Sequence, residues 1–131
     1  MTAYALTALI TLLVLILLFG VAVNVGMARG RYGIKAPATS GHDMFDRAYR
    51  IQMNTIESSV LMLPALWLCA GFYSDTRAAI LGAFWLLARI WYAIGYQRNP
   101  ASREAGFTLS VLAFALLWVG AMWGVARTLL G

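Results

Sequence analysis

Charged and amide side chains occur inside stretches of this chain that are otherwise apolar enough to cross a membrane. Arg50, Asn54 and Glu57 are spaced at i, i+4 and i+7, so a helix over this stretch presents them on one face. Gln52 lies at the same depth. A charged residue within a membrane span costs about 2.5–3.5 kcal/mol on insertion scales, and it therefore marks a partner or a functional site.

A second polar group lies further along the chain. Arg89, Tyr92 and Tyr96 are spaced at i, i+3 and i+7, and Arg103 opens the next apolar stretch. A helix N-terminus there would add about half a positive charge to that of the side chain. Arg29, at the end of the first apolar stretch, adds another cation. Cations with tyrosine and amide donors, and few acids, are typical of a pocket for an anionic ligand.

A purely structural interpretation is also open for two of these residues. Glu57 and Arg89 could form one buried ion pair, and the other polar groups could form hydrogen bonds that only hold the helices together. This interpretation leaves the additional arginines at positions 29, 50 and 103 without a role, so we favour the pocket.

The composition requires that most of the surface meets something other than water. The chain has 131 residues, of which 62% are hydrophobic and 11% charged, whereas soluble domains have about 25% charged residues. Four stretches are long enough to cross a bilayer as helices, at about 3–28, 45–73, 76–97 and 101–130. The length allows one compact unit. The sequence thus predicts a single domain over residues 1–131, an all-α integral membrane bundle of four helices.

Helix starts have side-chain signals of their own. Ser74 or Asp75 is a suitable N-cap for the third helix. Asn99 is a suitable N-cap for the fourth, followed by Pro100 at the first helical position.

The cations predict an orientation in the membrane. Of the ten, only Arg77 and Arg127 belong to the second loop and the C-terminal end, and Arg89 lies within a span. The other seven lie in or beside the first and third loops: Arg29, Arg31, Lys35, Arg47, Arg50, Arg98 and Arg103. The positive-inside rule therefore predicts that these two loops are cytoplasmic and that both termini face out. Cations at segment ends do not form the basic stripe of a nucleic-acid-binding protein.

Other chemistries lack their signatures. Cys69 is the only cysteine and His42 the only histidine, so the sequence predicts neither a disulfide framework nor a metal site. No phosphate-binding loop, nucleotide fingerprint or Ser-His-Asp pattern is visible.

Two runs of residues resemble a known family. The run from Phe45 to Glu57 resembles the second-helix signature of the MAPEG family, the membrane-associated proteins of eicosanoid and glutathione metabolism. The run from Ala88 to Arg103 resembles its third-helix signature. The resemblance extends over essentially the whole chain, including the number of helices and the lengths of the first and third loops. Both runs, in this order and on the corresponding helices, make the resemblance specific.

The resemblance implies a homotrimer that binds glutathione between neighbouring subunits near the cytoplasmic face. Glu57 would accept the α-amino group, and Arg29 and Gln52 would reach in from the adjacent subunit. Arg103 would lie against the sulfur as the catalytic residue. The positions that match the family's glutathione-binding residues are Arg29, Arg50, Gln52, Asn54, Glu57, Arg89, Tyr92, Tyr96 and Arg103.

The implied chemistry needs no nucleophile from the protein. A free thiol has a pKa of about 8.5, so only a small fraction is ionised at neutral pH. Lowering that pKa by two units requires about 2.7 kcal/mol, which Arg103 at a helix N-terminus would supply. The thiolate of glutathione, the co-substrate, would then attack a lipophilic electrophile delivered by membrane lipid. The expected activity is that of a glutathione transferase, with reduction of lipid hydroperoxides as a further activity.

Two positions depart from the members that make leukotriene. Those members have a tyrosine directly after the Glu57 position and a second arginine directly after the Arg29 position, whereas this chain has Ser58 and Gly30. The departures argue against a dedicated eicosanoid synthase. They favour a general detoxifying member, most like a bacterial microsomal-type glutathione S-transferase.

Two other functions are weighed against this one. A non-enzymatic scaffold of the same family would bind or present lipids, but it would not need Arg103 or the two tyrosines. A small multidrug transporter is also a short four-helix protein with a glutamate in the membrane. Its glutamate lies in the first helix, however, where this chain has no acid.

Overall fold

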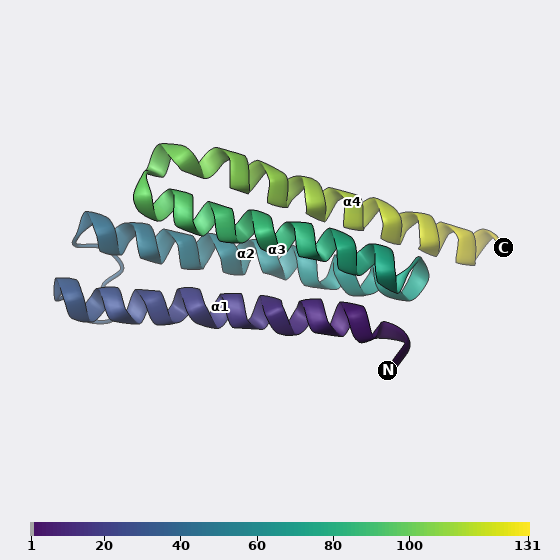
Figure 1. Cartoon of the computed structure of the whole chain (residues 1–131), viewed down its shortest axis with the longest axis horizontal. Coiled ribbons are helices and arrows are strands. Elements are labelled where there is room, and N and C mark those ends of the chain that lie inside the picture. The colour runs from purple at the N-terminus through teal and green to yellow at the C-terminus, as the bar shows by residue number, and fades with distance from the viewer. Residues whose placement is uncertain (1) are drawn as a thin grey trace.

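The computed structural model describes residues 2–131, and these residues form helices and connecting turns without a strand (Figure 1). All four long helices have the length and composition to cross a membrane. The prediction of an all-α membrane bundle is therefore confirmed. In chain order the elements are η1 (Thr2–Tyr4), α1 (Ala5–Tyr32), α2 (Asp43–Phe72), α3 (Asp75–Arg98), η2 (Pro100–Ser102) and α4 (Arg103–Leu130).

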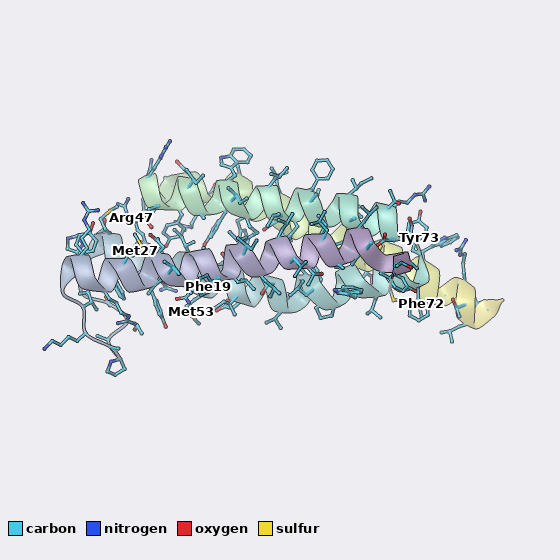
Figure 2. All side chains as sticks on the ribbon, turned by 60° about the horizontal axis from the view of Figure 1, so that its bottom comes forward. Phe19, Met27, Arg47, Met53, Phe72 and Tyr73 are labelled. Carbon is cyan, nitrogen blue, oxygen red and sulfur yellow. The ribbon has the colours of Figure 1, made fainter. Side chains whose placement is uncertain are left out.

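The helices run up and down beside one another, so the connections gather at two ends (Figure 1). The α1–α2 loop and the α3–α4 turn lie at one end, which we call the loop end. Both termini and the α2–α3 turn lie at the other, which we call the terminal end. Figure 2 shows Met27 and Arg47 toward the loop end, and Phe72 and Tyr73 at the terminal end. Helices α2 and α3 form the middle of the bundle, with α1 and α4 packed on them.

Helix α1 continues to Tyr32, four residues beyond the predicted end at residue 28. The residue that ends it is Gly33, whose φ of 67° lies in the left-handed region that glycine adopts without strain. Arg29 and Arg31 therefore lie in the last helical turn and not in a loop. Their charges interact favourably there with the negative end of the helix dipole.

The turn between α2 and α3 is fixed by two side chains. Ser74 Oγ accepts a hydrogen bond from the Arg77 N–H at 3.2 Å, so Ser74 is the N-cap of α3. The Asp75 carboxylate instead accepts from the backbone N–H groups of Leu6 and Thr7, at 3.3 and 3.0 Å. The start of α1 is thereby bound to the start of α3.

The fourth helix begins with one turn of 3₁₀ helix. Asn99 Oδ1 accepts from the Ala101 N–H at 3.1 Å, and Pro100 occupies the first position, as the sequence predicts. The α-helical hydrogen bonding starts at Arg103, two residues after the predicted start. Arg103 thus lies at the N-terminus of α4.

The main core occupies the terminal half of the bundle. Helix α4 approaches α2 closely there, since a Cβ added at Gly124 would lie 2.4 Å from the Phe72 carbonyl oxygen. Large apolar side chains also cover the outside of all four helices; Phe19, for example, is 72% exposed. Lipid is the solvent that accommodates such a surface. The largest apolar core side chains, each buried, are Ile10, Val14, Met62, Leu66, Trp85 and Leu117.

Candidate functional site

A cavity of about 490 Å³ opens between α2, α3 and α4 in the loop half of the bundle. This volume falls within the usual range for small-molecule sites, about 300–1,000 Å³. Its lining is Arg50, Met53, Asn54 and Glu57 from α2, Tyr92 and Tyr96 from α3, and Arg103, Glu104 and Phe107 from α4.

Helix α2 supplies one wall because its lining residues recur every three or four positions. Arg50 and Glu57 are exposed, and neither side chain forms a hydrogen bond or ion pair with residues 2–131. A cation and an anion are therefore available on one wall, separated by two helical turns. Such a wall can bind both ends of a zwitterionic molecule.

Two tyrosines of α3 form the second wall. Tyr92 is almost fully buried, at 3% exposed, and its ring meets that of Tyr96 edge-on, with centroids 5.7 Å apart. The ring of Phe107 lies 6.4 Å from that of Tyr92, measured between centroids. These aromatic contacts limit how far the tyrosine rings can turn, so the wall is ordered before a ligand enters.

Helix α4 reaches the cavity because a glycine lets it approach α3. A Cβ added at Gly106 would lie 2.6 Å from the backbone nitrogen of Tyr92 and 2.8 Å from the Ala88 carbonyl oxygen. This contact brings Arg103 to Tyr96, with the guanidinium carbon 5.6 Å from the ring centroid. A cation at a helix N-terminus stabilises an anion held beside it.

Arg89 does not form the ion pair with Glu57 that the sequence left open. Its guanidinium is fully buried behind the cavity wall. Nη2 donates to Asn54 Oδ1 at 2.7 Å and to Thr55 Oγ1 at 3.0 Å, and Nη1 donates to Ser110 Oγ at 3.3 Å. Within residues 2–131 the one ion pair is Asp43–Arg47. This alternative is excluded because Arg89 reaches the buried side of α2, whereas Glu57 is exposed.

Two predicted residues lie outside the cavity of their own chain. Arg29 donates to the Ala38 carbonyl oxygen at 2.7 Å, and its guanidinium lies over the ring of Phe45. Gln52 is half-buried and does not line the cavity. Six of the nine predicted residues therefore share the cavity, and Arg89 lies directly behind it. The prediction for Arg29 and Gln52 involves an adjacent subunit, so it stays a prediction.

Three lining residues were not predicted. Met53 follows Arg50 by three positions, and Phe107 follows Arg103 by four, so helical spacing places both on the faces of predicted residues. Glu104 is adjacent to Arg103. For Met53 and Phe107 the spacing was available in the sequence, but an apolar residue on a polar face gives no chemical signal.

A second cavity lies on the other side of the same part of α2. It has a volume of about 430 Å³ and shares Arg50, Met53 and Glu57 with the first. Its remaining lining is Thr39, Ser40, Asp46 and Tyr49. The three shared side chains thus separate two polar cavities, one between the helices and one beside the first loop.

The fold and the cavity define a class: all-α, multi-pass membrane proteins with a pocket lined by ionisable residues at one end of the bundle. The model of the MAPEG family matches residues 7–123, a range that includes the entire cavity lining. The chain belongs to the MAPEG family, as the two helix signatures predict.

Relatives match over most of their length. An uncharacterized protein of Synechocystis sp. is 48% identical over 116 residues, covering 88% of this chain and 82% of the relative. Microsomal glutathione S-transferase 2 of Bos taurus is 32% identical over 109 residues, covering 83% and 75%. Leukotriene C4 synthase of Rattus norvegicus is 36% identical over 113 residues, covering 86% and 75%.

Proposed function

We propose that this protein is a membrane-bound glutathione transferase that ionises the thiol of glutathione for attack on lipophilic electrophiles. The observation that supports this most directly is the shared cavity of Arg103 with Arg50, Glu57 and the two tyrosines. Membership of the MAPEG family, with a named glutathione S-transferase among the relatives, supports the same conclusion.

The charges of glutathione complement those of the cavity. At neutral pH the tripeptide has two carboxylates and one ammonium group. In the proposed complex Arg50 and Asn54 donate to carboxylate or backbone oxygens, Glu57 accepts from the ammonium group, and the tyrosine hydroxyls donate to the remaining oxygens. Hydrogen bonds with a charged partner contribute about 1.5–3 kcal/mol each. The tripeptide is thereby held at several points, which orients its sulfur.

Arg103 is the proposed catalytic residue. Its charge and the N-terminus of α4 stabilise the thiolate, and the thiol proton leaves to water at the loop end. The thiolate then forms a bond to the electrophilic carbon, and a leaving group such as chloride departs with its electron pair. Holding both reactants at the membrane surface supplies the remaining acceleration by proximity.

Lipid hydroperoxides are a second proposed substrate. The thiolate attacks the terminal peroxide oxygen, the O–O bond breaks, and the lipid alkoxide takes a proton and leaves as an alcohol. A second glutathione reduces the resulting sulfenic acid, giving glutathione disulfide and water. The hydroperoxide is thus reduced by two electrons, which two molecules of glutathione provide.

The proposed assembly is a homotrimer in a bacterial inner membrane, with the loop end in the cytoplasm. Seven of the ten cations belong to the segments at the loop end, which supports this orientation. Arg29 and Gln52 do not reach the cavity of their own chain, so an adjacent subunit is their proposed route to it. Glutathione from the cytoplasm would enter directly at this end.

The test uses the purified protein in lipid nanodiscs. We expect saturable binding of glutathione by calorimetry, a thiolate ultraviolet absorbance near neutral pH, and conjugation of a chlorinated nitrobenzene. A folded protein that binds lipophilic compounds without conjugating them is instead a lipid-presenting scaffold. Proton-dependent dye efflux that requires Glu57 would identify a transporter. Absence of glutathione binding contradicts the proposal.

A further inference from the structure

The ionisable residues that line the cavity have no net charge. Arg50 and Arg103 contribute two positive charges, and Glu57 and Glu104 contribute two negative charges. The excess of cations that the sequence predicted is therefore not in the lining. A ligand with a net negative charge gains no overall attraction from these four side chains together.

The excess charge lies one layer deeper, on Arg89. Its guanidinium is fully buried and is bonded to three neutral groups, Asn54, Thr55 and Ser110. None of the five acids compensates it. Two of them, Glu57 and Glu104, line the cavity; Asp43 pairs with Arg47, Asp46 binds Ser40 and Gly41, and Asp75 binds Leu6 and Thr7. A buried charge is screened less than one in water, so its field reaches the cavity.

Arg89 contacts two residues of the wall directly. Its guanidinium carbon lies 4.1 Å from the ring centroid of Tyr92, and its Nη2 binds Asn54 Oδ1 at 2.7 Å. Arginine has donors only, so this bond fixes which end of the Asn54 amide faces away from the cavity. The amide NH2 group forms no hydrogen bond with residues 2–131 and remains available to donate to a ligand.

We propose that Arg89 is a positioning residue that gives the cavity its net positive charge and fixes Asn54 as a donor, and thereby selects ligands with a net negative charge. This inference rests on the proposed function. Glutathione has a net charge of −1 with its thiol protonated and −2 as the thiolate, so attraction to Arg89 increases on ionisation. Arg89 acts through the wall and does not contact the ligand.

Ser110 offers a way to neutralise Arg89 without altering the cavity lining. It is fully buried, lies behind the wall on α4, and contacts the guanidinium. Ser110→Asp places a carboxylate beside Arg89. Ser110→Asn is the neutral control, because asparagine has the same size as aspartate. The probes are S-methylglutathione, with net charge −1, and its dimethyl ester, with net charge +1; neither has a reactive thiol.

We expect the wild type to bind the acid more tightly than the ester. In Ser110→Asp this preference falls by about tenfold, the effect of roughly one pKa unit of electrostatic interaction, and the thiolate absorbance of bound glutathione moves to higher pH. Ser110→Asn keeps the preference and the pH profile of the wild type. The inference would be overturned if the preference changed equally in the two variants, or if Ser110→Asp lost binding of both probes to the same extent. Either result would show that Arg89 only supports the fold.

If Ser110→Asp fails to fold, a second pair of variants tests whether the charge of Arg89 sets the preference for the acid. Arg89→Lys keeps the charge, and Arg89→Gln removes it. The inference requires that the preference for the acid over the ester survives in the lysine variant and is lost in the glutamine variant. A preference that both variants keep, or that both lose, contradicts it. A wild type that binds neither probe contradicts the proposed function, whereas one that binds both equally contradicts only the charge inference.

Discussion

The loop half and the terminal half of the bundle share the same kinds of helix contact and helix cap, but the side chains between their helices differ. Each has a glycine of α4 against a neighbouring helix, Gly106 in the loop half and Gly124 in the terminal half. Each also has a side-chain cap at a helix start, from Asn99 and Ser74 respectively. The terminal half packs an apolar core, and the cavity between α3 and α4 there is lined mostly by apolar side chains. The loop half instead has a polar cavity.

The two halves therefore differ in content: the terminal half has the main packed core, and the loop half has the candidate site. Lipid provides no hydrophobic drive for helix association, so close packing and interhelical hydrogen bonds hold the helices together. The terminal half has the larger packed core and therefore supplies most of that packing. The loop half can keep exposed ionisable groups because the other half holds the helices in place. Matched substitutions in the two halves test this division.

Arg103→Ala should give the largest effect. Loss of the charge that we propose lies beside the sulfur should lower kcat/KM for conjugation by about 100-fold, which corresponds to two pKa units of thiolate stabilisation. Steady-state conjugation of a chlorinated nitrobenzene measures the change. Arg127→Ala, in the last turn of α4 at the terminal end, is the control and should keep wild-type activity. Similar losses in both variants would remove the distinction between the two halves.

Glu57→Gln should give the next largest effect, on binding and not on thiolate formation. The glutamine keeps the shape but loses the charge that we propose meets the ammonium group, so the Kd for glutathione should rise about tenfold. Calorimetry measures the Kd. Asp43→Asn, which removes a carboxylate outside the cavity, should leave it unchanged. An unaltered Kd in Glu57→Gln would exclude the proposed contact with the amino group.

Gly106→Ala and Gly124→Ala form a matched pair. The added Cβ would clash with backbone atoms in both, at 2.6 Å and 2.4 Å, so each variant should lose about 1–3 kcal/mol of stability by overpacking. Unfolding midpoints in detergent titrations measure this loss. Only Gly106→Ala should also lower kcat/KM for conjugation, because it moves Arg103 relative to Tyr96. A lowered kcat/KM in Gly124→Ala would show that the two halves are coupled.

Asn99→Ala and Ser74→Ala should give the smallest effects. Each removes a cap and should cost about 1 kcal/mol of stability. Asn99→Ala should in addition change kcat modestly, since the capped turn sets the start of α4 and hence the position of Arg103. Ser74→Ala should leave the activity per folded molecule unchanged. Identical activities in the two variants would show that Arg103 is positioned by the Gly106 contact alone.

Most of the fold could be predicted from the sequence because apolar length determines membrane spans. The ends of the helices were harder to predict than their existence. The predicted end of α1 was residue 28, but the left-handed residue that ends the helix is Gly33. Helix α4 starts two residues after the predicted position because the turn after Asn99 adopts 3₁₀ geometry before the α-helix begins. Both differences arise from local hydrogen bonding that hydrophobicity does not encode.

The candidate site could be predicted one helical face at a time. Spacing placed Arg50, Asn54 and Glu57 on one face, and in the structure all three line one cavity. Spacing within a helix does not determine which turn of a neighbouring helix it meets. The partners of Arg89 were therefore missed: Thr55 is adjacent in sequence to a predicted residue, and Ser110 lies in the fourth helix. Short hydroxyl side chains in apolar helices gave no signal for this role.

The burial of Arg89 also constrains how the chain enters the membrane during synthesis. Helix α3 emerges from the ribosome before α4, yet one of the groups that satisfy its arginine, Ser110, lies in α4. A helix with an arginine at its centre enters lipid at a cost of about 2.5–3.5 kcal/mol. We therefore expect α3 to remain beside α2, which provides Asn54 and Thr55, until α4 arrives to complete the bundle.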